Sequence, residues 1–139
     1  MLVCRYLFKY TGDDSNEKIH KIVKNLIQKY DTTNPIELAN HLGIIVKHKP
    51  YSQKTKGLYV KIFDSKFIII NCNLKKEDQE IILSHILGHS LLHFNNDTIF
   101  AWENSLFPQG IQENEANIFA LELITNHNLL KSTNYQPTF

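Results

Sequence analysis

Three histidines follow one another at four-residue intervals in the segment EIILSHILGHSLLHF, residues 80–94. On a helix, His89 lies about 40° and His93 about 80° around the axis from His85, so the three share one side. Leucines cover the opposite side, and a helix that is apolar nearly all round is a buried one. A buried imidazole is costly unless both ring nitrogens have partners, and a metal ion is a partner that two rings can share.

Zinc suits this spacing. Side chains at positions i and i+4 of a helix lie about 5–6 Å apart at Cβ, so two imidazoles can both reach one ion at about 2.0–2.1 Å. His85 and His89 therefore predict a site for one zinc ion. His93 is poorly placed as a third ligand, and we expect it to be structural or to support a ligand from behind. The alternative is that the pair arose by chance among the seven histidines of the chain.

A zinc site with two helical histidines needs a third protein ligand, often a carboxylate from a later helix, and a fourth position for water. In the predicted last helix, Glu115 falls on the same face as Ile111, Ile118 and Phe119. An unpaired charge on an apolar face is expensive, so Glu115 is predicted to be the third ligand.

Two more glutamates lie on the same predicted helix. Glu122 returns to the face of Glu115 seven residues later, and we expect it to orient a histidine or to close the pocket from behind the ligands. Glu113 is expected to point away from that face, into solvent. The alternative is that Glu115 and Glu122 both pair with surface lysines.

The elements that must position these residues follow from hydrophobic periodicity. Helical spacing predicts helices over 15–30, 35–42, 73–94 and 111–126. Asn34 and Asn73 are the predicted caps at the start of the second and third helices, and Gly43 is predicted to end the second. The period changes after Gly43, and apolar runs predict three strands between the second and third helices. The run Phe67–Ile70 is unbroken, as in a strand covered on both faces. Residues 95–110 are predicted to be a loop that rims the cleft, in which Trp102 and Phe107 either contact a partner or anchor the loop. Two helices, a small three-stranded sheet and two helices make an α+β fold.

The bulk composition excludes several function classes. A chain of 139 residues is long enough to bury a core, and a formal net charge of +1 gives no reason to expect direct binding of nucleic acid or of a membrane surface. Cys4 and Cys72 form no CxxC pair, which argues against a disulfide framework. The segment MLVCRYLFKYTGDD is too short and too charged for a signal peptide or a membrane span, so we expect a cytoplasmic protein.

The segments IILSHILGHSLLH and ENEANIFALELI together resemble the ImmA/IrrE-type zinc metallopeptidases, which carry H-E-x-x-H followed by E-x-E-A-N-x-F-A-x-E-L. The resemblance extends to NPIELANHLGIIV and FIIINCNL upstream. It implies a zincin-like single domain over 1–139, with a core of about 15–126 and a polar tail over 127–139. It further implies zinc held by His85, His89 and the glutamate that matches Glu115.

The resemblance also implies a function. Family members of this size are commonly cytoplasmic proteins of phages and mobile elements, and they relieve repression by cutting a helix-turn-helix transcriptional repressor. This chain departs from the family pattern at Ile86, where the catalytic glutamate should stand. General acid–base help is typically worth about 10²–10⁴-fold, so peptide hydrolysis should be severely impaired. Glu113 or Glu122 could replace the base only from the facing helix, and nothing in the sequence supports that.

Two other function classes remain open. One is a pseudoprotease, which keeps the fold and the zinc and regulates by binding a partner protein without cutting it. The other is a DNA-binding module, because IELANHLGI resembles the first helix and turn of a helix-turn-helix. A recognition helix should follow, but the chain continues as IVKHKP, and the near-neutral net charge also argues against DNA binding.

Overall fold

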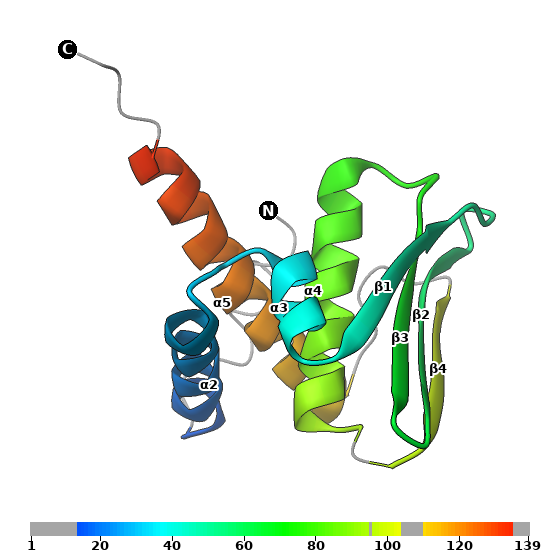
Figure 1. Ribbon diagram of the computed structural model, residues 1–139, viewed down its shortest axis with the longest axis horizontal. Coiled ribbons are helices and arrows are strands. Elements are labelled where there is room, and N and C mark those ends of the chain that lie inside the picture. The colour runs from blue at the N-terminus through cyan, green and yellow to red at the C-terminus, as the bar shows by residue number, and fades with distance from the viewer. Residues whose placement is uncertain (1–13, 95, 104–109, 135–139) are drawn as a thin grey trace.

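The structure is a computed structural model, and it describes residues 14–94, 96–103 and 110–134. The helices are α2 (Asp14–Tyr30), α3 (Pro35–His41), α4 (Lys76–Leu92) and α5 (Ile111–Asn134); the strands are β1 (Ile44–Lys49), β2 (Thr55–Ile62), β3 (Ser65–Asn71) and β4 (Thr98–Glu103). Figure 1 shows the sheet on one side of the molecule, α4 lying along it, and α5 and α2 beyond α4. The predicted α+β class is confirmed.

Helix α3 is defined by its ends. The Asn34 side chain accepts hydrogen bonds from the backbone N–H groups of Ile36 and Glu37, and Pro35 takes the first position, where no N–H is needed. Gly43, at φ 77°, ends the helical segment, and β1 begins at the next residue. A strand thus stands where a helix-turn-helix would have its recognition helix, which removes the sequence-based reason for a DNA-binding module.

The sheet has four strands, one more than predicted, in the order β1-β3-β2-β4. Strand β1 runs parallel to β3, and the other neighbouring strands are antiparallel. The additional strand is β4, which lies within the segment predicted as a loop. Six residues between turn signals are too few to show a clear alternation. Pairing with β2, which the local sequence does not encode, makes this segment a strand.

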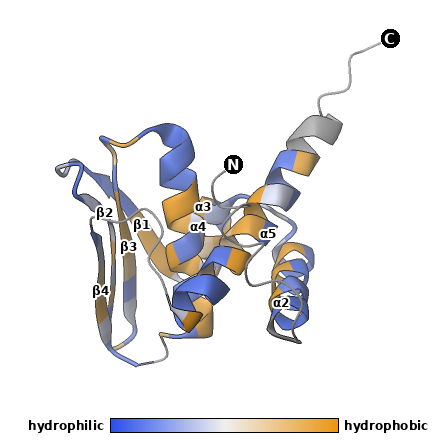
Figure 2. Ribbon diagram, turned by 180° about the vertical axis from the view of Figure 1, so that it is seen from behind, coloured by the Kyte–Doolittle hydropathy of each residue, from blue (hydrophilic) through white to orange (hydrophobic). Residues whose placement is uncertain are grey.

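The core lies between α4 and the inner face of the sheet. Fully buried residues from both layers fill it: Tyr59, Ile68, Ile70, Ile82, Ile86 and Leu87. Figure 2 shows that the first turns of α4 are hydrophilic and that its middle, beside the sheet, is hydrophobic. In the run Phe67–Ile70 of β3, Ile68 and Ile70 are fully buried, whereas Phe67 and Ile69, which point to the other face, are only partly buried. The prediction that this strand is covered on both faces was therefore wrong for the described residues.

Two helix ends differ from the predicted ones. Helix α4 follows Lys75 without a side-chain cap, because Asn73, the predicted cap, instead donates its side-chain N–H to the Tyr51 carbonyl oxygen. Helix α5 continues to Asn134, through much of the predicted polar tail. Within the described ranges, no helix combines the length and apolar character needed to span a bilayer.

Candidate metal centre

Three side chains of metal-ligand type, two buried histidines and one partly buried glutamate, meet at one point between two helices. Nε2 of His85 lies 3.1 Å, and Nε2 of His89 2.6 Å, from the same carboxylate oxygen of Glu113. The two imidazoles are 1% and 2% exposed and the glutamate side chain is 14% exposed. One ligand atom from each residue lies within 4.8 Å of the others, so a single ion could contact all three.

The other ring nitrogen of each histidine, Nδ1, is hydrogen-bonded to a side chain outside the cluster. Nδ1 of His85 lies 2.7 Å from the side-chain oxygen of Asn117, which can only accept, so this nitrogen carries the proton. Nδ1 of His89 lies 3.0 Å from Nδ1 of His93, whose Nε2 lies 2.9 Å from the Glu115 carboxylate. If His93 donates from Nε2 to this carboxylate, its Nδ1 can accept the proton of His89.

This proton assignment leaves three acceptors facing one another. Both Nε2 atoms then present lone pairs to an oxygen of Glu113 that also accepts. Three acceptors without a proton repel one another, and a cation between them removes the repulsion. The arrangement of Asn117 and His93 behind the rings is also the usual way in which metal-ligating histidines are oriented.

Electrostatics favour the metal-binding protonation states. Burial lowers the pKa of His89 below its usual value, which favours the neutral ring. Burial alone would raise the pKa of Glu113, but when His85 and His89 carry a proton at Nε2, their hydrogen bonds to the carboxylate outweigh burial and hold the pKa at about 2. The site therefore presents a carboxylate at neutral pH beside a His89 ring that favours the uncharged form.

The positions predicted for two of the glutamates are reversed. Glu113 faces the two histidines, whereas Glu115, predicted as the ligand, contacts His93 instead. The prediction rests on large apolar residues as the buried face of the helix, but Ile111, one of them, is 79% exposed.

Small residues mark the true contact face of α5. Ala116 and Ala120 are fully buried there, and a Cβ placed on Gly88 of α4 would lie 3.0 Å from Cβ of Phe119. This small-residue signal was available in the sequence, and it places Glu113 and Asn117 toward α4. Asn117 was missed because an amide is a common surface residue.

The remaining predicted residues lie as follows. Glu122 does not approach the histidine helix: it lies 2.9 Å from Nδ1 of His20 on α2, so it orients none of the three histidines. Trp102 does not rim a cleft, because it belongs to β4, is 1% exposed and packs against the His85 ring at 4.4 Å between centroids. Phe107 lies outside the described residues.

Ile86 turns toward the sheet. Its side chain is fully buried, and a Cβ added to Gly57 of β2 would lie 2.9 Å from its Cδ1 atom. The position that carries the general base in the H-E-x-x-H pattern is thus occupied by a core residue, in contact range of a strand that has no side chain at that point.

The cluster of His85, His89 and Glu113, the metal-type cluster, opens to a cleft of about 400 Å³. The lining residues are His89, Phe94, Phe100 and the first residues of α5 with Gly110 before them. His89 stacks on the Phe94 ring at 5.0 Å between centroids. A ligand from solvent can therefore reach the His89 and Glu113 side of the cluster, as catalytic metal sites require.

Comparison with known proteins agrees with this geometry. The profile of peptidase family M78, described as the IrrE N-terminal-like domain, matches residues 39–136. The chain belongs to this family. The ImmA/IrrE resemblance seen in the sequence is thereby confirmed, and a metallopeptidase family implies a bound metal.

Two relatives of this ImmA/IrrE-type domain are similar over most of its length. A Bacillus phage phi105 protein named Uncharacterized immunity region protein 2 is 40% identical over 106 residues, which cover 76% of this chain and 67% of the relative. A Bacillus subtilis (strain 168) protein named Metallopeptidase ImmA is 28% identical over 122 residues, which cover 87% of this chain and 69% of the relative.

Proposed function

We propose that this chain is a zinc-binding, cytoplasmic protein of phage or mobile-element type that acts on a helix-turn-helix transcriptional repressor, with peptide hydrolysis severely impaired. The observation that carries the proposal is the convergence of His85, His89 and Glu113 on one point, with each imidazole held from behind. The relative named for a phage immunity region and the relative named Metallopeptidase ImmA support the biological setting.

The donor set fits zinc. Two neutral imidazoles and one carboxylate are a common ligand set of catalytic zinc sites, and Glu113 is our proposed third ligand in place of Glu115. When bound, zinc would lower the pKa of a coordinated water and polarise a peptide carbonyl. Asn117 and the pair His93–Glu115 would fix the two rings, and a fourth ligand could enter through the cleft at His89.

Hydrolysis also needs a group that takes a proton from water and passes it to the leaving amine. Ile86 can do neither. Of the described acids, Glu113 is the one that joins the histidines, and as a ligand it is not free to act as the base. Glu115 is bonded to His93 on the far side of His89. Loss of the base should cost about 10²–10⁴-fold in rate.

A second candidate function is a pseudoprotease that binds the repressor without cutting it. Complete burial of Ile86 against Gly57 favours it, because this position serves packing rather than the cleft. Both versions share the zinc site and the partner, and they differ in whether any repressor is cut.

Metal analysis with matched glutamate variants tests the site. We expect purified protein to carry one zinc ion per chain, Glu113→Gln to lose most of it, and Glu115→Gln to retain it with weaker affinity. Isothermal titration of the apoprotein with zinc measures all three. Zinc retained by Glu113→Gln but lost by Glu115→Gln would contradict the proposed ligand set.

Co-expression with the helix-turn-helix repressor of the same immunity region tests the partner. We expect the two proteins to co-purify, with little or no fragment of the repressor from the wild-type chain. Rapid cleavage that disappears in His89→Ala would defeat the claim of impaired hydrolysis. If there is neither association nor cleavage, the repressor is not the partner.

A further inference from the structure

The outer face of the sheet carries two apolar rows that cross all four strands. Cross-strand pairing aligns one row as Ile45, Phe67, Val60 and Ile99 and the next as Lys47, Ile69, Leu58 and Ala101. Successive residues of a strand point to opposite faces, and the alternate residues Tyr59, Ile68 and Trp102 are buried beneath the helices. The eight residues of the two rows therefore point outward, and all of them except Lys47 are apolar.

This face lies outside the core. Ile45 is 50% and Ile99 74% exposed, and Phe67, Val60, Ile69 and Leu58 are only partly buried. No described helix lies on this side, since Figure 1 shows α2, α3, α4 and α5 all on the other side of the sheet. Contiguous apolar patches of this kind mark interaction sites in soluble proteins.

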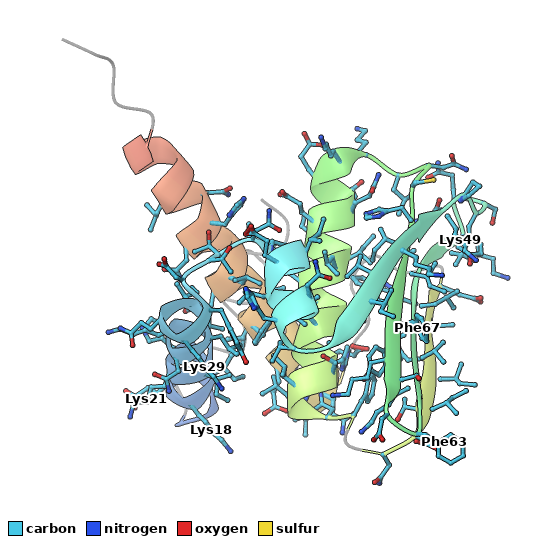
Figure 3. All side chains as sticks on the ribbon, in the orientation of Figure 1. Lys18, Lys21, Lys29, Lys49, Phe63 and Phe67 are labelled. Atoms are coloured by element: carbon cyan, nitrogen blue, oxygen red, sulfur yellow. The ribbon has the colours of Figure 1, made fainter. Side chains whose placement is uncertain are left out.

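Neighbouring residues extend the patch at one end and give it charge at the other. Ile62 is 46% exposed, and Phe63, at the turn after β2, is 81% exposed and projects away from the body in Figure 3. The Lys47 ammonium lies 5.9 Å from the Phe67 ring centre, which places this side chain along the outer face. At the opposite end, Lys49 continues the outward series of β1 and Glu103 that of β4.

We propose that two copies of this chain associate through this outer face, as two sheets packed face to face about a two-fold axis parallel to the strands. Two identical twisted sheets match in shape when their strands run within about 30° of each other. The rotation exchanges the two edges of the sheet, so Ile45 of one copy lies opposite the partner's Ile99.

Charge complementarity selects this arrangement. Lys49 and Glu103 lie at the same end of the sheet, on opposite edges: Lys49 pairs with Asn71, Glu103 pairs with Thr55, and the Asn71 side chain donates to the Thr55 carbonyl at 2.8 Å. The same rotation therefore brings Lys49 opposite the partner's Glu103, twice by symmetry. A second copy thus supplies both the apolar surface and the opposite charge at each corner.

The size of the face sets the expected strength. Four strands about 4.8 Å apart and six residues of about 3.3 Å each give a footprint of roughly 400 Å² per copy. Two copies would bury about 800 Å², below the roughly 1,200 Å² of standard stable interfaces. We therefore expect a reversible dimer with a Kd in the micromolar range. The helical side that carries the metal-type cleft stays open.

Sedimentation equilibrium of the 139-residue chain, from about 1 to about 200 µM, tests the proposal because this range of concentrations brackets that Kd. Ile99→Asp should weaken the dimer by at least about tenfold. Leu129→Asp is the matched control, since Leu129 is 61% exposed on α5 and away from the sheet, and its dimer should equal the wild type. Circular dichroism and zinc titration check that each variant is folded.

A charge exchange tests the orientation. Lys49→Glu and Glu103→Lys should each weaken the dimer by several-fold, and the two together in one chain should restore it. A wild-type chain that is monomeric throughout overturns the proposal, and so does a dimer that is insensitive to Ile99→Asp and to the charge variants. A chain that dimerises only after removal of residues 1–13, or that uses this face to bind the repressor, also overturns it and assigns the face to that occupant.

Discussion

Replacing Ile86 with glutamate separates the cost of burying an acid from the gain of a general base. Ile86 is fully buried, so the change loses roughly 1.5–3 kcal/mol of apolar burial. A carboxylate placed in the same space adds a desolvation penalty of several kcal/mol unless a positive group compensates it. Without zinc we therefore expect about 3–5 kcal/mol of destabilisation, or roughly 10–20 °C in Tm for a chain of 139 residues.

Zinc changes the sign of the local electrostatics. A divalent cation held by His85, His89 and Glu113 would attract the new carboxylate, so we expect zinc to restore part of the lost Tm in Ile86→Glu. The Ile86 side chain faces β2, so the glutamate can act as a base only in a rotamer that turns from Gly57 toward the ion. In that rotamer a base lowers the barrier for hydrolysis by about 2.7–5.5 kcal/mol, the equivalent of about 10²–10⁴-fold in rate. The variant should therefore be less stable than the wild type and a faster protease.

Ile86→Gln is the matched control, because it has the shape and polarity of the glutamate but cannot take up a proton. Thermal unfolding with and without zinc measures the stability effect, and the appearance of repressor fragments over time measures the rate. We expect both variants to be destabilised and only Ile86→Glu to cut. The reasoning is refuted if zinc-loaded, folded Ile86→Glu cuts no faster than Ile86→Gln, or if the wild type already cuts as fast as Ile86→Glu.

Further predictions concern the residues behind and beside the cluster. Asn117→Ala should lower zinc affinity about 10–100-fold in isothermal titration, because a ligand ring loses its acceptor, whereas Asn114→Ala, a buried amide without that role, should change it far less. Gly57→Ala should cost about 1–3 kcal/mol in urea unfolding, since the new methyl would lie 2.9 Å from Ile86, and Ile86→Val in the same chain should recover part of it. The pKa of Glu113 falls from 4.5 to about 2 on folding, so the free energy of unfolding of the apoprotein should decrease by about 3 kcal/mol as the pH drops from 4.5 to about 2. The Glu113→Gln variant should not show this decrease. An equal loss in that variant would assign the pH effect to other groups.

Patterns that local sequence encodes were predicted well. The helix caps at Asn34 and Gly43 and the change of period after Gly43 depend on residues that are close together in the chain. These features follow from propensity and period alone, so a single sequence is enough to recognise them.

Features that depend on distant partners were not predicted. Strand β4 exists because β2 offers an edge, and the facing side of α5 is set by how closely Phe119 approaches Gly88. Large apolar side chains are the usual sign of a buried helix face, but helices that pack closely do so through small residues. Large apolar residues therefore predict Glu115 rather than Glu113 as the ligand, although both stand in the same motif.

The structure explains how the proposed metal ligands could keep their positions when the general base is absent. His85 is held by Asn117 and His89 by His93, while Glu113 is delivered by the first turn of a separate helix. None of these contacts involves the side chain at position 86, which faces β2 on the sheet side of α4. Metal binding and core packing at this helix therefore rest on different faces. An isoleucine can replace the acid without removing a ligand or a support, and it adds apolar contact with the sheet.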